Sequence, residues 1–540
     1  MKLKFLIILL SISLPLAAQH TKSNLDFHVK DYSKAANFNP KSAMKPGSTP
    51  VIPAISKYPV SNFITDIFRS GDTVWFATGS GIMRTVDHFS SFQSYYGLAP
   101  FGKDDISGLA INGNIIAVAT ATSQEINGES VAVGTGIKIS TDNGASWSAY
   151  PQPLDGLHDT TLVYGSNTIH CLPVVVPQQN LAYDIAITRT KGDLANYTIW
   201  ISTFAGGVRK TTDYGATWQR VLLPSDLLDS IYIGGTGYTY NLNPNQNLNH
   251  RAFTIEADND SVLYAGTANG INRSTDWGVS WRKFNFQNSG FGTNRVSGNF
   301  VVNLYIQNFP GYKVLWAATR KAEGKDEFNA YSYTTNGGIT WSNTLRDINP
   351  YNISSYNNIV YLQTDAGLWR GLFGVLDWVS APTIFDKTTN DYLKTNSFYS
   401  GNNLGDTLYF GTQDGLVKTH ETGSPWASDW RIIRSIKTID LTSDKKTYAA
   451  PNPFAPADEN VRIFFKTGKA ASKVTIKLFD FGMNPVRTVL QNAARNSADE
   501  LFAIWDGKNN EGFQVPNGVY FYRIEIDDDT PVWGKILVIQ

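Results

Sequence analysis

One arrangement of apolar and turn residues recurs along this chain. A short run rich in Val, Ile, Tyr, Trp and Thr leads into a Thr, a Gly–apolar pair and a turn, as in TVWFATGSGIMRT from Thr73 and TLYFGTQDGLVKTH from Thr407. Runs of this kind on either side of a glycine are typical of a strand–turn–strand unit. The other five copies begin at Val131, Thr198, Val262, Val314 and Ile359.

The seven units cover residues 55–436, so each averages roughly 55 residues, more than the ~40–50 of a plain four-stranded repeat. Insertions at 152–195 and 223–250, and an interruption of the fifth unit at 321–329, account for the excess. Such insertions fall in loops on one face. One small sheet cannot bury both of its faces, whereas seven arranged radially can. The pattern predicts an all-β fold with a seven-bladed β-propeller over residues 55–436.

The last ninety residues follow a different pattern. From residue 450, alternating runs such as VRIFF, KVTIKLF and NGVYFYRI are separated by Gly, Asn and Asp turns. This alternation predicts a small antiparallel, immunoglobulin-like β-sandwich over residues 450–540, joined to the propeller by a linker at 437–449. Residues 20–54 are rich in Lys, Ser, Asn and Pro without an apolar period, and predict a second linker.

The first nineteen residues have the pattern of a secretory signal peptide. Lys2 and Lys4 precede the apolar run Phe5–Leu16, and small residues follow it. This run is too short to cross ~30 Å of hydrocarbon, and no later stretch reaches ~18 uninterrupted apolar residues. We expect an exported protein without a transmembrane span.

The composition excludes several classes of protein. Lys and Arg number 46, and so do Asp and Glu, which argues against binding nucleic acid or an anionic bilayer through bulk charge. One cysteine, Cys171, allows neither a disulfide framework nor a thiolate zinc site. The seven histidines form no i, i+4 pair. We therefore expect no cofactor and no metal.

A sharper motif follows the Gly–apolar strand in several units. Its carboxylate or amide can close a turn on the backbone, its glycine allows a positive φ, and its tryptophan buries a large ring. The copy at Asp87 is degenerate, with Phe where Gly and Trp belong, and the last two units lack the motif. The clear copies are Asp142, Gly144 and Trp147; Asp213, Gly215 and Trp218; Asp276, Gly278 and Trp281; and Asn336, Gly338 and Trp341.

This motif resembles the Asp-box, S/T-x-D-x-G-x-S/T-W, of BNR or sialidase-like propellers. The resemblance implies that these residues are structural and lie at the rim, away from the central site. Sialidases also use an Arg-Ile-Pro motif, which this chain lacks. Xyloglucan-type glucanases, sortilin-like receptors and a photosystem assembly factor share the Asp-box without sharing a reaction, so the resemblance leaves the function open.

The C-terminal segment resembles the type A sorting domain of the type IX secretion system, which is similar to the immunoglobulin-like domain of hook-capping proteins. The shared residues are PNPF-x-P from Pro451, WDG-x-N-x-x-G from Trp505, NGVYFYRI from Asn517 and the last strand from Gly534. The resemblance implies an organism related to the Bacteroidota and the type IX secretion machinery as partner. It also implies release into the medium or attachment at the cell surface, with the tail either removed or kept.

Paired carboxylates on the strands that open each unit are the candidates for catalysis. Asp66, Asp184 and Glu256 occupy such strands. A glycosidase needs two carboxyls ~5–10 Å apart. The alternative is structural, with Asp66 and Glu256 capping hairpins.

Three functions fit these patterns. The first is a non-enzymatic, secreted or surface propeller that binds a protein or glycan or serves as a scaffold. The second is a glycoside hydrolase of Asp-box type, and the third an assembly factor for another exported complex. The first is favoured by the two predicted targeting signals, at the N-terminus and in the C-terminal segment. It is also favoured because the recurring motifs are interpreted as structural.

Overall fold

The computed structural model describes residues 48–126, 129–322, 324–423, 425–439, 441, 446–469, 471–495 and 500–540. The predicted signal peptide and residues 20–47 of the first predicted linker lie outside the described residues. In the part that is described, no helix is long and apolar enough to cross a membrane.

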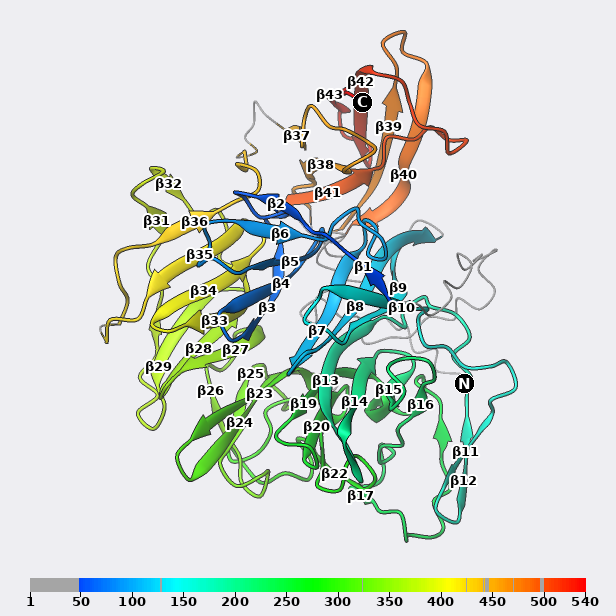
Figure 1. Cartoon of the computed structure of the whole chain (residues 1–540), viewed down its shortest axis with the longest axis vertical. Coiled ribbons are helices and arrows are strands. Elements are labelled where there is room, and N and C mark those ends of the chain that lie inside the picture. The colour runs from blue at the N-terminus through cyan, green and yellow to red at the C-terminus, as the bar shows by residue number, and fades with distance from the viewer. Residues whose placement is uncertain are drawn as a thin grey trace, which may run out of the picture.

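Among the described residues between 49 and 433, seven antiparallel sheets of four or five strands follow one another along the chain (Figure 1). The innermost strands are β3 (Ile64–Ser70), β7 (Asp105–Asn112), β13 (Ala182–Thr190), β19 (Ala252–Ala257), β23 (Phe300–Phe309), β27 (Pro350–Tyr356) and β33 (Phe398–Leu404). The second strands are β4 (Thr73–Thr78), β8 (Ile115–Ile126), β14 (Asp193–Thr203), β20 (Leu263–Thr267), β24 (Tyr312–Arg320), β28 (Ile359–Thr364) and β34 (Thr407–Thr412).

The outer half of each sheet is shorter. The third strands are β5 (Gly81–Thr85), β9 (Glu129–Ser140), β15 (Gly207–Thr211), β21 (Gly270–Ser274), β25 (Ala330–Thr334), β29 (Gly367–Leu372) and β35 (Gly415–His420). The fourth strands are β6 (Phe92–Ser94), β10 (Ser146–Tyr150), β16 (Gln219–Arg220), β22 (Trp281–Phe284), β26 (Ser342–Thr344), β30 (Val379–Ser380) and β36 (Arg431–Ile433). Three sheets gain a fifth edge strand, namely β2 (Ala54–Ser56), β1 (Thr49–Pro50) and β17 (Ser230–Ile231).

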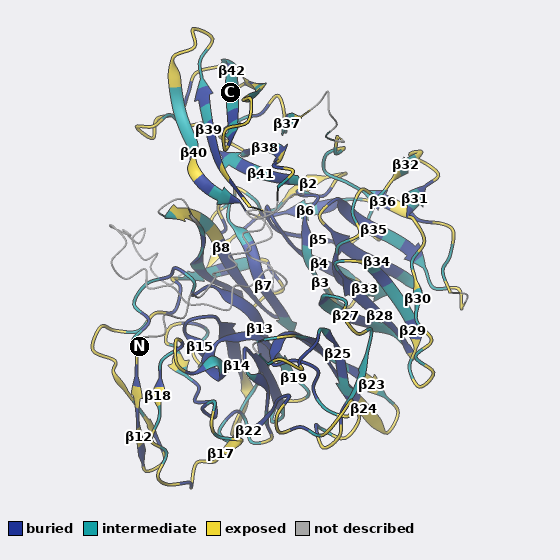
Figure 2. Ribbon diagram, turned by 180° about the vertical axis from the view of Figure 1, so that it is seen from behind, coloured by how far each residue is buried: buried dark blue, intermediate teal, exposed yellow. Residues whose placement is uncertain are grey.

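The innermost strands form a closed ring. Each contacts the innermost strand of the next sheet, and β33 of the last sheet contacts β3 of the first. The faces between sheets are buried, as the dark blue strands of Figure 2 show. The predicted all-β propeller is therefore confirmed. Edge strands β1 and β2 begin inside the segment predicted as a linker, because strands of two or three residues leave no apolar period in the sequence.

The two ends of the ring carry different turns. In an antiparallel sheet, the turns joining strands one to two and three to four lie at one end. The turns joining strands two to three, and the connections between sheets, lie at the other end, which we call the connection face. The long insertions lie in these connections, so they share this face. The first insertion is shorter than predicted, because residues 182–190 belong to the inner strand β13.

Small elements are built from these insertions. One sheet combines β11 (Thr161–Tyr164), β12 (Asn167–Cys171) and β18 (Asn241–Leu242), and a 3₁₀ helix η3 covers Leu248–His250. A hairpin of β31 (Phe385–Asp386) and β32 (Asp391–Tyr392) precedes the last sheet. The second of the recurring sequence runs, from Val131, lies in the third strand β9, because the β8–β9 hairpin is much longer than its counterparts.

Two sheets form the C-terminal sandwich. The first is made of β37 (Thr447–Ala450), β38 (Val461–Lys466) and β41 (Glu500–Trp505). The second is made of β40 (Pro485–Arg495), β39 (Ser472–Phe479), β42 (Gly518–Ile526) and β43 (Val532–Val538). Alternate residues of both sheets, such as Ile463, Ile476 and Ile524, bury their side chains in a shared core.

The sandwich lies against the connection face of the propeller (Figure 1). Arg462 of β38 donates from its guanidinium to the carbonyl of Gly79 at 2.6 Å and to the Ser80 hydroxyl at 2.5 Å, in the turn between β4 and β5. Arg495 at the end of β40 pairs with Glu125 of β8 at 2.9 Å, and the Arg495 side chain is almost fully buried. Specific polar contacts therefore hold the two parts together.

Candidate functional site

The residues that resemble the Asp-box close a compact turn between the third and fourth strands. Asp276 shows the pattern: its Oδ1 accepts the backbone N–H of Ser280 at 2.8 Å and the hydroxyl of Ser274 at 2.9 Å. The N–H of Gly278 donates to the Ser274 hydroxyl at 2.9 Å, and Trp281 Nε1 donates to the Gly278 carbonyl at 3.0 Å. The bonds of Asp276, Ser274, Gly278 and Trp281 thus stay inside the turn itself.

The other copies repeat these contacts. Oδ1 of Asp142, Asp213 and Asn336 each accepts the N–H four residues later at 2.9 Å. The degenerate copy does the same, since Asp87 accepts the N–H of Ser91 at 3.0 Å. These turns join strands three and four, so they lie at the end of the ring opposite the connection face.

Two features of the structure require glycine at the motif position: its positive φ and the close approach of a neighbouring side chain. Its φ is 82° at Gly144, 95° at Gly215, 72° at Gly278 and 95° at Gly338. A Cβ at Gly144 would lie 2.7 Å from Trp75 of the neighbouring sheet, and one at Gly278 would lie 2.5 Å from Trp200. In the degenerate copy Phe89 adopts a φ of 71° and stacks on Tyr409 with ring centroids 3.9 Å apart. The turn therefore also packs one sheet against the next.

We expect Asp276→Ala to lower the free energy of unfolding by about 1–2 kcal/mol, because the Ser280 amide and the Ser274 hydroxyl lose their acceptor. Partial burial raises the pKa of Asp276, but hydrogen bonds from Ser280 and Ser274 outweigh it and hold the pKa below its usual value. Asp276→Asn is the matched control and should be nearly neutral, since Asn336 makes the same bonds. Urea denaturation followed by circular dichroism measures both; equal losses would contradict this account.

The innermost strand of every propeller sheet contains a β-bulge near its start. The pairing of the first and second strands shifts register by one residue near the start of each innermost strand. Such a bulge redirects side chains. The residues just after it form an equivalent ring around the axis, which we call the polar ring: Asp66, Gly108, Asp184, Thr254, Asn303, Asn352 and Ser400.

The two predicted aspartates of the polar ring accept backbone bonds. Asp66 and Asp184 each accept the N–H of the following isoleucine at 2.9 Å, as Asn352 does at 2.8 Å. The second oxygen of Asp184 also accepts the hydroxyl of Thr254 at 2.6 Å and the N–H of Ile255 at 3.0 Å, both in the next inner strand. Asp184 thus joins two neighbouring sheets, an alternative that the sequence argument did not include for this residue.

The third predicted carboxylate lies at a different level. Glu256 is two residues beyond the polar-ring position Thr254, which displaces it along β19 by about 7 Å. Its side chain is half-buried. Asp66 and Asp184 therefore share one ring, separated by the sheet that contributes Gly108, and Glu256 lies outside that ring.

Aromatic residues at the connection face were missed by the sequence argument. The residue within each bulge is Tyr183, Phe253, Tyr351 or Tyr399 in four of the seven inner strands. Tyr351 stacks on Tyr399 with centroids 5.2 Å apart, and Phe63 meets Tyr399 edge-on at 5.1 Å. Phe502 of the sandwich packs against this Phe63–Tyr399 pair. An aromatic residue directly before a polar one in four of the seven opening strands was the signal that could have found them.

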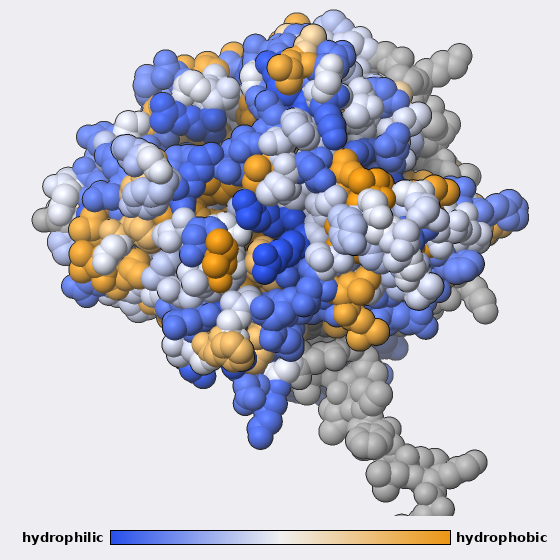
Figure 3. Space-filling model, turned by 90° about the horizontal axis from the view of Figure 1, so that it is seen from below, coloured by the Kyte–Doolittle hydropathy of each residue, from blue (hydrophilic) through white to orange (hydrophobic). Residues whose placement is uncertain are grey.

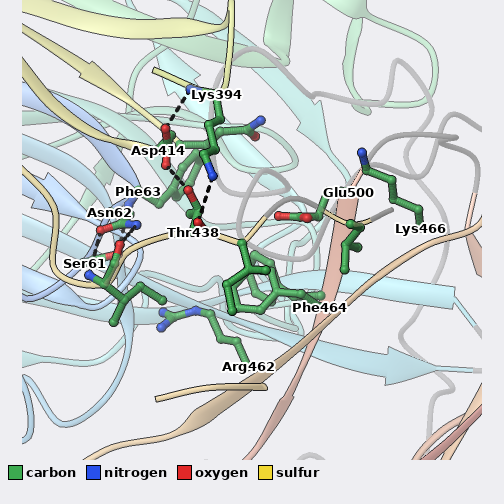
Figure 4. A pocket seen from close by; sticks show the side chains of 15 residues that line it. Ser61, Asn62, Phe63, Lys394, Asp414, Thr438, Arg462, Phe464, Lys466 and Glu500 are labelled. Carbon is green, nitrogen blue, oxygen red and sulfur yellow. Dashed lines mark hydrogen bonds between the residues drawn. The ribbon is translucent and has the colours of Figure 1, made fainter. Parts of the chain in front are cut away.

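A cleft of about 160 Å³ lies where the sandwich meets the propeller (Figure 4). Asp414 on the propeller side accepts the N–H of Lys394 at 2.8 Å and the hydroxyl of Thr438 at 2.7 Å. Arg462 and Phe464 line the opposite side. Because the Asp414 carboxylate is occupied by contacts that hold the segment after β36, the cleft is a structural seam with a mixed apolar and charged lining.

No group of three His, Cys, Asp or Glu that could hold a metal ion occurs in the described ranges. Cys171 is buried and its Sγ lies 3.7 Å from the carbonyl of Ile169. Burial raises the pKa of this thiol. Cys171 is therefore a small apolar residue of the insertion.

No family model matches this chain. Two curated relatives, both xyloglucanase Xgh74A of Acetivibrio thermocellus, are similar to part of it. One is 28% identical over 194 residues, covering 33% of this chain and 19% of the relative. The other is 29% identical over 152 residues, covering 25% and 16%. The chain thus spans less than a fifth of the curated relatives it matches.

Three solved structures of differently named proteins are similar to this chain in backbone path. PorZ, a surface component of the type IX secretion system of Porphyromonas gingivalis, is 14% identical, with 89% of this chain and 66% of that chain covered and a TM-score of 0.30. A GH74 enzyme of Niastella koreensis is 12% identical, with 92% and 75% covered and a TM-score of 0.44. YCF48 bound to D1 peptide is 16% identical, with 70% and 100% covered and a TM-score of 0.41.

Proposed function

We propose that this protein is an exported propeller that binds a protein or glycan or serves as a scaffold, without catalysing a reaction. The observation that carries this proposal is the use of Asp184. Its Oδ1 accepts the N–H of Ile185 within β13, and its Oδ2 accepts the bonds from Thr254 and Ile255 that join β13 to β19. A carboxylate engaged in this way is ill suited to attack a substrate or transfer a proton.

The connection face supports a binding role. Its insertions expose apolar side chains, with Val163 and Leu157 of the first at 74% and 70%, and Tyr232 of the second at 59%, of their full accessible area. Exposed apolar side chains that gather in one region mark interaction surfaces. Figure 3 shows the molecule from below, with apolar side chains in separate patches among polar ones.

Export through the type IX system is the proposed route, on the strength of the C-terminal resemblance. Intact-mass and localisation analysis in the native host tests it. We expect a species that lacks both ends, on the outer surface or in the medium. A full-length tail retained in the periplasm would overturn this route and move the assembly-factor function forward.

A glycoside hydrolase is the second candidate, favoured by the partial match to a xyloglucanase. Asp66 and Glu256 are then the carboxylates to replace, as Asp66→Asn and Glu256→Gln. Reducing-sugar release from xyloglucan, compared with these variants, distinguishes the two functions. Turnover by the unaltered protein that either substitution abolishes would establish the hydrolase and refute the binding role.

A further inference from the structure

The four-stranded sheet of the C-terminal sandwich (Figure 1) packs one face on the three-stranded sheet and turns its other face outward. On β39 the side chains of Ile476 and Leu478 enter the core, so Lys477 and Phe479 point outward. The same alternation turns Phe521 and Arg523 of β42, and Trp533 and Lys535 of β43, to this face. We call this set the aromatic–cationic face.

Its rings form contacting pairs, each with one exposed member. Trp533 keeps 45% of its accessible area and Phe481, just after β39, keeps 78%. Phe479 and Trp533 have ring centroids 5.6 Å apart, and Phe481 and Phe521 are 6.2 Å apart. A sheet exposing linked rings on its outer side has the character of a binding surface rather than of an ordinary solvated face.

Two positively charged side chains of this face lie opposite each other, which is electrostatically unfavourable. Lys477 lies directly opposite Arg523, and Lys535 lies opposite Phe521 in the same register. Like charges directly opposite on one sheet face are destabilising. Arg523 pairs with Glu525 and lies over the Trp533 ring at 5.8 Å. Among the described residues, the ammonium groups of Lys477 and Lys535 have no ion-pair or hydrogen-bond partner.

We propose that the aromatic–cationic face binds an anionic polysaccharide. Flat rings stack on the C–H faces of sugar units, while the ammonium groups of Lys477 and Lys535 pair with carboxylates or sulfates. Lysine is depleted in protein–protein interfaces, which makes a protein partner a poorer fit to this lysine-bearing strip. The inference goes beyond the proposed role of the propeller, does not rest on it, and applies to the protein for as long as it keeps its C-terminal sandwich.

Affinity electrophoresis of the full chain in gels containing alginate tests the proposal, with dextran as the neutral comparison. We expect alginate to retard the protein and dextran to leave it unaffected. Lys477→Glu/Lys535→Glu should weaken the retardation about tenfold, which corresponds to ~1.4 kcal/mol of binding energy, and Trp533→Ala should weaken it independently. Lys325→Glu/Lys387→Glu on the propeller makes the same change in net charge at two exposed lysines and should leave the retardation unchanged.

Several outcomes would overturn the proposal. These are no retardation by alginate, equal retardation by dextran, or equal weakening by the propeller control pair. Retention on vesicles containing anionic phosphatidylglycerol without retention by alginate would assign the face to a membrane instead. Circular dichroism checks that each variant is folded, and Trp533→Ala tests the face without any change of charge.

Discussion

Replacing Trp147 by Ala is expected to lower the free energy of unfolding by about 3–5 kcal/mol, the usual cost of removing a large aromatic side chain from a core. The ring is 1% exposed and lies in the seam between the first two sheets. Its centroid is 4.9 Å from that of Phe101, 5.9 Å from Tyr95 and 6.3 Å from Trp75. Its Nε1 also donates to the Gly144 carbonyl at 3.2 Å.

Trp218 provides a control at the same position of another copy. Its ring is only half-buried, and its Nε1 has no hydrogen-bond partner among the described residues. We expect Trp218→Ala to cost about 1 kcal/mol, because less apolar area and no hydrogen bond are lost. Denaturation monitored by far-ultraviolet circular dichroism compares the two without relying on tryptophan emission. Similar losses of unfolding free energy in the two variants would mean that membership of the motif, rather than burial of the ring, determines the contribution of each tryptophan to stability.

Asp155→Ala is expected to destabilise the first insertion by about 3–5 kcal/mol, because it leaves buried positive charge without a partner. Oδ1 of Asp155 accepts from Arg209 at 2.7 Å and from Arg220 Nε at 3.0 Å, and Oδ2 accepts the N–H of Val174 at 2.6 Å. The side chains of Asp155 and Arg209 are 5% and 2% exposed. Thermal denaturation and limited proteolysis of residues 151–181 measure the loss.

Asp159→Ala is the matched control, since Asp159 is an exposed aspartate of the same insertion that caps only the Gly156 amide at 2.7 Å. It should change the melting temperature by far less than Asp155→Ala. Equal effects of the two substitutions would show that the buried charges do not hold the insertion.

The Asp155 contacts also predict a dependence on pH. Burial raises the pKa of this carboxyl, but hydrogen bonding to Arg220 and the charges of Arg209 and Arg220 outweigh it, so the pKa lies below its usual value. A depressed folded pKa gives stability that is present above the unfolded value of about 4 and is lost as pH falls through the folded pKa. The melting temperature of Asp155→Asn should therefore fall less than that of the unaltered protein on acidification below about pH 4. Parallel curves would contradict this linkage.

The candidate site was only partly accessible from the sequence. The opening strands were found, and so were Asp66 and Asp184 on them, because strand patterns are local. The bond from Thr254 to Asp184 joins residues 70 positions apart, and its formation depends on how two sheets pack. The same holds for Phe502, which reaches Phe63 and Tyr399 from the other end of the chain.

The sequence by itself determined the recurring strands and the Asp-box turns. Each of these is specified within a few residues, by alternation of apolar positions and by a carboxylate that accepts an amide four residues later. Tertiary structure alone decided which polar groups remain available for function, since that depends on what the neighbouring sheet supplies. Asp184 is occupied by the next sheet, whereas the ammonium groups of Lys477 and Lys535 have no partner among the described residues, because burial and pairing are properties of the assembled fold.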